Sequence, residues 1–153
     1  MITYQTAVLP EWVDYNGHLR DAFYLLIFSY ATDAFMDRIG LACDDRANSG
    51  TSLFTLEAHI NYLHEVKLGA QVQVQTQVIG HDHKRLHLFH SLHIDAGQAL
   101  AASEQMLLHV DLAGPRSAPF SAGSLQLLEA FIADQGELAA PQCVGKVIAL
   151  AQR

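Results

Sequence analysis

The feature that most restricts the fold is an apolar run in the first quarter of the chain. Residues 22–31 read AFYLLIFSYA, and only Ser29 interrupts the run. Such a run is too short to span a bilayer, which needs about 20 residues. A helix that is apolar around its whole circumference must therefore be buried within protein. Asp21 can accept hydrogen bonds from the first turn, and Gly40 suits the left-handed conformation that closes many helices. We predict one long buried helix between these two residues.

Beyond this run, the apolar residues change from helical spacing to alternation with a period of two. In residues 71–78, three valines and Thr76 alternate with four glutamines, which is typical of a strand with one buried face. Residues 54–62, 86–94 and 100–110 alternate in the same way. The expected buried faces of the first and last of these are Phe54, Leu56, Ala58, Ile60 and Tyr62, and Leu100, Ala102, Glu104, Met106, Leu108 and Val110.

Short turns join the last three of these strands, which predicts an antiparallel meander. Residues 2–9 add a short strand, and residues 121–133 have the spacing of an amphipathic helix. The predicted fold is α+β, with one domain over residues 1–153. In it, an antiparallel sheet of about five strands wraps a long central helix, and a second helix lies near the C-terminus. Because one sheet covers only part of an all-apolar helix, we also predict a homo-oligomer, either a dimer or a dimer of dimers.

Charge and composition exclude some partners. The net charge of −7 and the pI near 5.6 disfavour nucleic acid and anionic membranes, which bind basic surfaces. The first residues, MITYQTAV, lack the basic start and apolar core of a signal peptide, so we predict a cytoplasmic protein.

Cys43 and Cys143 lack ligand spacing and are expected to be free thiols. His81 and His83 could begin a metal site, but no third ligand is placed by spacing, so we predict no metal and no cofactor.

The loop before the helix carries the pattern Asp14-x-x-Gly17-His18, followed by Tyr24. This pattern resembles the hotdog-fold family of 4-hydroxybenzoyl-CoA thioesterase-like proteins, whose loop reads D-x-x-G-H-x-N-N-x-x-Y. Arg20 and Asp21 stand where that family has two asparagines. Four stretches more narrowly resemble the betainyl-CoA thioesterases of carnitine catabolism: PEWVDYNGH (10–18), TLEAHINYLHEV (55–66), KRLHLFH (84–90) and EQMLLHVD (104–111). The resemblance covers roughly residues 3–112. It implies a hotdog fold and hydrolysis of an acyl-CoA such as betainyl-CoA to glycine betaine and coenzyme A.

The resemblance assigns catalysis to the loop. An aspartate beside Asn-Gly is usually a turn former, but in this family pattern Asp14 would attack the thioester carbonyl or activate water. The helix start offers backbone N–H groups to the developing oxyanion. Gly17 has no Cβ, so a thioester could approach the backbone closely. Asn16 and His18 complete the predicted catalytic set, with His18 either a proton donor or a loop residue that bonds the backbone.

Aromatic and charged side chains near this loop are the candidate substrate-binding residues. Aromatic faces attract quaternary ammonium groups, which fits a betainyl group. Lys84 and Arg85 are either a solvated hairpin tip or a contact to the coenzyme A phosphates. The candidates are Trp12, Tyr15, Tyr24, Phe28 and Tyr62 for the acyl group, Glu57 and His59 for the pocket lining, and Lys84 and Arg85 for coenzyme A.

Two other functions compete with hydrolysis. Hotdog hydratases and dehydratases carry Asp-x-Asn-Pro-x-His, which Asp14-Tyr15-Asn16 begins to resemble. Here Gly17 replaces the proline and His18 comes one residue early, so the spacing favours hydrolysis. A non-catalytic acyl-CoA-binding module is the third possibility, and the intact Asp14 beside a helix start argues against it.

Overall fold

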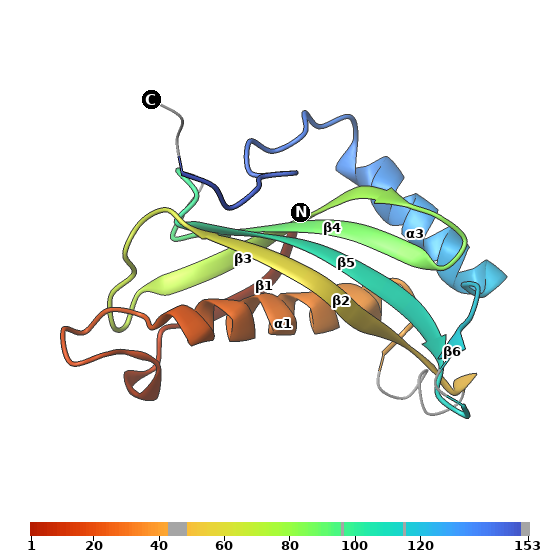
Figure 1. Ribbon diagram of the computed structural model, residues 1–153, viewed down its shortest axis with the longest axis horizontal. Coiled ribbons are helices and arrows are strands. Elements are labelled where there is room, and N and C mark those ends of the chain that lie inside the picture. The colour runs from red at the N-terminus through yellow and green to blue at the C-terminus, as the bar shows by residue number, and fades with distance from the viewer. Residues whose placement is uncertain (43–48, 96, 115, 151–153) are drawn as a thin grey trace.

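The computed structural model describes residues 1–42, 49–95, 97–114 and 116–150. A curved antiparallel sheet lies over one long helix, and a second helix lies at the far end of the molecule (Figure 1). Cys43, expected as a free thiol, lies outside the described residues. The elements in chain order are β1 (Ile2–Ala7), the 3-10 turn η1 (Pro10–Trp12), α1 (Asp21–Arg38), β2 (Thr51–Tyr62), β3 (Gln71–His81), β4 (Arg85–His93), β5 (Ala101–Asp111), β6 (Arg116–Ser117) and α3 (Ala122–Gln135).

The sheet has the order β1-β3-β4-β5-β2, and every pair of neighbours is antiparallel. The two-residue β6 pairs with the end of β5. This arrangement confirms the predicted meander of β3, β4 and β5. It also leaves β2, which is twelve residues long, as one edge of the sheet and β1 as the other. A long open edge presents unpaired backbone groups to any strand that approaches it.

Helix α1 begins and ends close to the predicted residues. Asp21 is its first residue rather than its cap, and its Oδ1 accepts from the Ala22 amide at 2.9 Å. Gly40 follows the helix with a φ of +73°, which only glycine adopts without strain. The face toward the sheet is buried, whereas Leu25 and Tyr30 are exposed. The chain thus covers one side of the helix, as expected for an apolar helix wrapped by one sheet.

A buried histidine lies between α1 and the sheet. The His90 ring is fully buried and stacks on Phe28 with centroids 5.9 Å apart. Its Nδ1 lies 2.9 Å from Thr76 Oγ1 and its Nε2 lies 3.0 Å from Thr32 Oγ1. Thr32 in turn donates to Gln105 Oε1 at 3.2 Å. This network joins the helix to three strands, and burial lowers the pKa of His90 to about 3.

Two predicted strand faces were wrong. The register of β2 against β5 shifts between Thr55 and Glu57, and such a bulge moves the following side chains to the other face. The predicted single face of Phe54, Leu56, Ala58, Ile60 and Tyr62 is therefore split. In β5 the side facing α1 carries residues such as Gln105, and the predicted face with Glu104 points away from the helix. The inner face of β5 carries polar residues of the His90 network. The alternation of polar and apolar residues along β5 therefore indicated the wrong face as the buried one.

The edge at β1 is modified by other parts of the chain. Strand β1 is six residues long, and its register against β3 shifts near its start. Arg38 Nη2 donates to the Ile2 carbonyl at 2.7 Å. At the Val78 end of β3, the Gln135 side chain of α3 accepts from the Val78 amide at 2.7 Å and donates to its carbonyl at 3.1 Å. Helix α3, which Ser121 caps as its side chain accepts from the Ser124 amide, thus occupies the hydrogen-bonding position of a strand.

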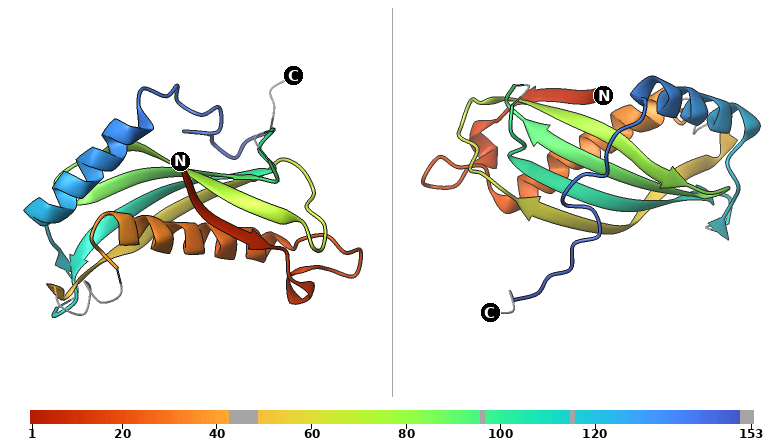
Figure 2. Two further views of the ribbon diagram at one scale, coloured as in Figure 1. Left: turned by 180° about the vertical axis from the view of Figure 1, so that it is seen from behind. Right: turned by 90° about the horizontal axis from the view of Figure 1, so that it is seen from above.

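The C-terminal segment after α3 crosses the outer face of the sheet, the face opposite α1 (Figure 2). Gln77 Nε2 donates to the Ala139 carbonyl at 3.5 Å, and the Gly145 amide donates to Glu104 Oε2 at 2.7 Å. The segment and the sheet enclose a cavity of about 530 Å³, which Cys143 lines. Within the described residues, no helix is long and apolar enough to cross a membrane.

Candidate active site

The loop that carries the sequence motif is closed by its own backbone. The Asp14 amide donates to the His18 carbonyl at 2.9 Å, and the Gly17 amide donates to the Asp14 carbonyl at 3.0 Å. A bridge between His18 and Lys67, and a bond of 2.8 Å from the Leu19 amide to the Val66 carbonyl, tie this loop to the loop after β2. The motif therefore sits in a fixed position directly before α1.

Backbone amides hold the Asp14 carboxylate. Its Oδ1 accepts from the Asn16 amide at 2.8 Å and from the His18 amide at 3.0 Å. These bonds, chiefly the one from His18, lower the pKa of Asp14 below its ordinary value of 3.8. Its Oδ2 accepts no hydrogen bond from the part of the chain that the structure describes. Asp14 is thus both a turn former and an ionised carboxylate with one oxygen available to a substrate or a water molecule.

The other members of the predicted catalytic set lie around this carboxylate. Gly17 has a φ of +77°, and a Cβ built there would meet nothing within 4 Å. The backbone at this position is therefore open to an approaching group. His18 is half-buried, and its Nε2 lies 3.3 Å from Glu65 Oε2. Asn16 is exposed and contributes its backbone amide to Asp14.

A cleft of about 290 Å³ opens between the start of α1 and the end of β2. The rings of Tyr24 and Tyr62 meet edge to face in it, with centroids 5.2 Å apart. The Tyr24 hydroxyl donates to the His64 carbonyl and the Tyr62 hydroxyl to the Asp21 carbonyl, each at 3.4 Å. Burial raises the pKa of both phenols, so both remain neutral donors. The lining residues are Leu19, Asp21, Tyr24, Tyr62, Leu63, His64 and Glu65.

The remaining predicted aromatic residues are not in this cleft. Trp12 is buried and stacks on Phe23 with centroids 5.9 Å apart. Phe28 is fully buried against His90. Tyr15, in contrast, is 94% exposed at the tip of the loop. The structure therefore brings Tyr24 and Tyr62 together, places Trp12 and Phe28 in the core, and leaves Tyr15 facing solvent.

Glu57 and His59 lie on the outer face of the sheet rather than in the cleft. They line a separate cavity of about 220 Å³ together with His87 and Glu104. The pair of His87 Nε2 and Glu104 Oε1, 2.7 Å apart, was not predicted from the sequence. The register of β4 against β5 in the predicted meander could have identified this pair. Across the described ranges, no group of three or more His, Cys, Asp or Glu residues is arranged to hold a metal ion.

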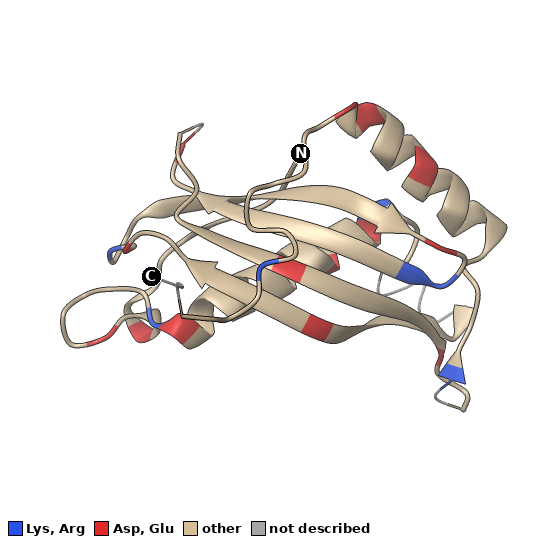
Figure 3. Ribbon diagram, turned by 45° about the horizontal axis from the view of Figure 1, so that its top comes forward, with Lys and Arg blue, Asp and Glu red and all other residues tan. Residues whose placement is uncertain are grey.

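Lys84 and Arg85 lie at the other end of the sheet. Arg85 pairs with Leu108 of β5, beside Phe54 of β2, whereas Tyr62 lies at the opposite end of β2. Apart from the adjacent Lys84 and Arg85, the lysines and arginines of the described residues are sparse and scattered (Figure 3).

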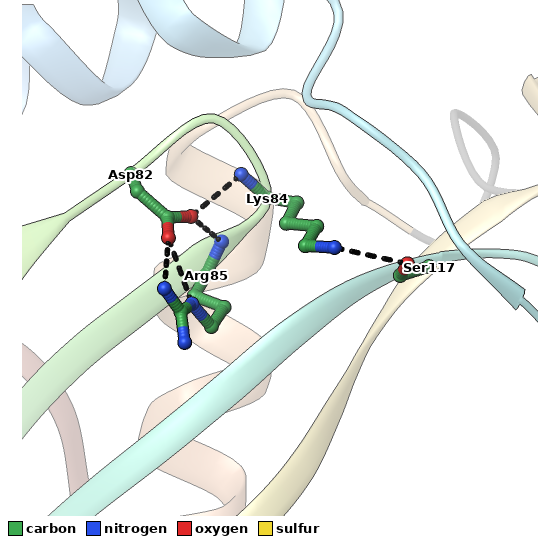
Figure 4. Close-up of polar contacts among 4 residues, drawn as sticks. All are labelled: Asp82, Lys84, Arg85 and Ser117. Atoms are coloured by element: carbon green, nitrogen blue, oxygen red, sulfur yellow. Dashed lines mark hydrogen bonds and ion pairs between the residues drawn. The ribbon is translucent and has the colours of Figure 1, made fainter.

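The carboxylate of Asp82 holds the turn that carries both cations (Figure 4). Its Oδ1 accepts from the amides of Lys84 and Arg85, and its Oδ2 lies 2.7 Å from both Nε and Nη2 of Arg85. These bonds hold the pKa of Asp82 well below its usual range. Lys84 Nζ donates to Ser117 Oγ at 3.4 Å. Within one chain, therefore, neither cation reaches the Asp14 loop.

Glu65 and His64 line the cleft, although the sequence reasoning did not select them. His64 and Glu65 lie two and three residues after Tyr62 in the stretch TLEAHINYLHEV. Their position just after a residue already selected was the available signal. Glu65 and Asp21 place two carboxylates around the cleft, and among the described residues no Lys or Arg lines it.

Comparisons with known proteins agree with this geometry. The model of the thioesterase-like superfamily matches residues 8–131. The betainyl-CoA thioesterase of Pseudomonas aeruginosa strain PAO1 is 63% identical over 151 residues, which cover 98% of this chain and 95% of that protein. The L-carnitine dehydrogenase/betainyl-CoA thioesterase of Agrobacterium fabrum is 43% identical over 118 residues, 77% of this chain but 24% of that larger protein.

Two solved structures have the same fold. A crystal structure from Pseudomonas putida KT2440 is 60% identical with a TM-score of 0.86, covering 99% of this chain and 97% of that chain. A Staphylococcus aureus protein in complex with CoA is 31% identical with a TM-score of 0.93, covering 99% and 96%. The predicted hotdog fold and the predicted enzyme class, a thioester hydrolase, are thereby confirmed. The chain belongs to the thioesterase-like superfamily.

Proposed function

We propose that this protein hydrolyses betainyl-CoA to glycine betaine and coenzyme A, as a cytoplasmic step of carnitine degradation. The observation that carries this proposal is the 63% identity, over almost the whole chain, to a Pseudomonas aeruginosa protein named betainyl-CoA thioesterase. The Agrobacterium fabrum relative combines that name with L-carnitine dehydrogenase in one protein. This combination supports the link to carnitine.

The chemistry starts from the Asp14 carboxylate and the first amides of α1. The Ala22 amide donates to Asp21 Oδ1 and the Phe23 amide to the Arg20 carbonyl, but the Asp21 amide donates to no described group. The Asp21 N–H at the positive end of the helix dipole is thus the donor for the oxyanion that forms at the thioester carbonyl. A thioester seated between this amide and Asp14 would meet a base or nucleophile on one side and an oxyanion donor on the other.

Two routes lead to the same products. In the first, Asp14 takes a proton from water while the water oxygen bonds to the carbonyl carbon. The tetrahedral intermediate then expels the thiolate, which receives that proton. In the second, an Asp14 oxygen attacks, the thiolate leaves, and water hydrolyses the mixed anhydride. A single turnover in ¹⁸O water that labels Asp14 identifies the second route, with attack of water on the Asp14 carbonyl carbon. The first route puts ¹⁸O in glycine betaine, as does the second when water attacks the acyl carbon.

The site is completed by a second copy of the chain. The edge strand β2 exposes Phe54, Leu56 and Tyr62, and α1 exposes Leu25. We place the dimer contact along β2, with the two copies antiparallel. This pairing brings the Thr51 end of the partner's β2 beside the Tyr62 end of β2 in this chain. The partner's Lys84–Arg85 hairpin lies toward that same end, because Arg85 and Phe54 share one end of the sheet. Its cations would then be available to the coenzyme A phosphates, and a dimer of dimers can form from this unit.

The cleft favours a cationic acyl group. The Tyr24 and Tyr62 rings offer aromatic faces, and Asp21 and Glu65 add negative charge. A trimethylammonium group gains up to about 2 kcal/mol from each desolvated cation–π contact. Two contacts of about 1.4 kcal/mol each lie within this limit and correspond to about a hundredfold in kcat/KM, at about 1.4 kcal/mol for each factor of ten.

Thiol release from a panel of short acyl-CoA thioesters tests the proposal. Betainyl-CoA should exceed its neutral isostere, 3,3-dimethylbutyryl-CoA, by about a hundredfold in kcat/KM. Equal values for the two would remove the cationic specificity but leave a thioesterase. Absence of thiol release from every thioester in the panel would contradict the proposed reaction itself. Light scattering on the same sample tests the dimer separately.

A further inference from the structure

The chain carries an apolar arm that no described part of its own fold covers. We define the arm as residues 146–150, KVIAL. Val147, Ile148 and Leu150 are 83%, 90% and 95% exposed. Single exposed aliphatic residues are ordinary, but a contiguous set on an extended segment marks an interaction site.

The direction of the arm is fixed at its root. The Gly145 amide donates to Glu104 Oε2 on the outer face of β5. The next residue, Lys146, lines the small outer cavity together with Glu57 and His59 of β2. The segment therefore passes over β5 and then over β2, the last strand of the sheet. The right view of Figure 2 shows the dark blue segment before the chain end passing β2 and leaving the body of the molecule.

We propose that the arm of each subunit crosses the subunit boundary and packs on the outer face of the partner's sheet. This inference rests on the dimer through β2 proposed above. If two copies pair about the middle of β2, between Leu56 and Glu57, then residues near Ala58 in one copy face residues near Thr55 in the other. An arm that leaves over Glu57 and His59 thus arrives beside the partner's Phe54.

An apolar patch lies at that place. Phe54 is 45% exposed and pairs with Leu108, while their neighbours Leu53 and Leu107 point into the core. Phe54 and Leu108 must therefore point outward, because side chains alternate along a strand. Half-buried Met106 lies on the same outer face. The patch and the arm are both aliphatic or aromatic, and a two-fold axis would bury two arms in two such patches.

Site-directed cross-linking tests this placement in the full-length protein. Both native cysteines are replaced by serine. One subunit carries Phe54→Cys and the other carries Ile148→Cys, with tags of different mass, and the two are co-expressed. Mild oxidation should convert most of the mixed dimer to a disulfide-linked species. In the matched control, Ile94→Cys, at an exposed residue at the other end of the sheet, replaces Phe54→Cys and should give no more than background.

Light scattering on the same samples makes each failure distinguishable. If the protein is a dimer but Phe54→Cys and Ile148→Cys cross-link no more than the Ile94→Cys control, the arm placement is wrong. The proposed function is not affected by that result. A monomer overturns the dimer and the arm together. A chain shortened after Lys146 gives a second measurement. Its dimer dissociation constant should rise at least about tenfold, since burial of one large aliphatic side chain is worth about a decade. Turnover per dimer should be unchanged, and an unchanged dissociation constant would contradict the inference.

Discussion

His90 should make the stability of this protein fall steeply in mild acid. The unfolded chain protonates this histidine at its ordinary pKa of 6.5, whereas in the folded protein burial lowers the pKa to about 3. Between these values the unfolded state binds the proton and the folded state does not. Stability is therefore fully present above pH 6.5 and is lost as the pH falls from 6.5 toward 3. At about 1.4 kcal/mol per pH unit, lowering the pH from 7 to 5 removes about 2 kcal/mol.

The geometry explains why the folded protein resists protonation here. Both ring nitrogens already lie within 3.0 Å of threonine hydroxyls, and none of the ring's partners in the described part of the chain is a carboxylate. A charged ring would have no counter-ion inside the core. A loss of about 2 kcal/mol is large against a typical total stability of 5–15 kcal/mol.

Urea unfolding at pH 7 and pH 5, at one fixed protein concentration, measures this effect. The His90→Gln variant should be less stable at pH 7, because a buried network loses a partner, but its stability should fall by about 2 kcal/mol less than that of the wild type between the two pH values. Phe28→Leu serves as the matched control, since it perturbs the ring stacked on His90 without removing a titratable group. Equal pH dependence in wild type and His90→Gln would refute the reasoning.

Three further changes test the site and the scaffold. Asp14→Asn should retain fold and KM but lose about a hundredfold or more in kcat, and a variant that keeps more than about a third of kcat would reduce Asp14 to a turn residue. Tyr62→Leu should lower kcat/KM for betainyl-CoA about tenfold, with little change for 3,3-dimethylbutyryl-CoA, and equal losses would exclude a cation–π role. Gln135→Ala should cost about 1–3 kcal/mol in urea unfolding, because the Val78 amide loses its partner; no loss would show that water replaces it.

The backbone plan was predictable because local signals agreed with one another. The apolar run predicted α1, the glutamine alternation predicted β3 and the amphipathic spacing of residues 121–133 predicted α3, and the structure confirms all three elements. The faces of β2 and β5 were not predictable in the same way. A single extra residue near Leu56 turns the side chains of the second half of β2 to the other face of the sheet. No local feature of the sequence indicates this bulge. Gln105 and Ser103 of β5 are polar because they face the buried His90, so tertiary context determined their burial.

The candidate site was predictable where the motif is contiguous. Asp14, Gly17 and His18 lie in one loop, and Tyr24 follows on the helix that the loop begins. Residues in other elements depended on knowing the packing. Trp12 precedes the loop, yet its ring turns into the core against Phe23. The role of the Lys84–Arg85 hairpin remains a prediction, because it depends on how two copies meet.

The unequal edges of the sheet bear on how large an assembly can grow. A sheet with two open edges can add copies without limit, as fibrils do. Here β1 is short and carries a register shift, Arg38 binds a carbonyl of it, and Gln135 of α3 holds the backbone of Val78 beyond it. Of the two edges in the described part of the chain, β2 is the longer, with twelve residues against six in β1. When two copies pair through β2, both β2 edges are hydrogen-bonded and neither stays open. Sheet extension then stops at two chains, and an edge that could promote aggregation forms a defined assembly instead.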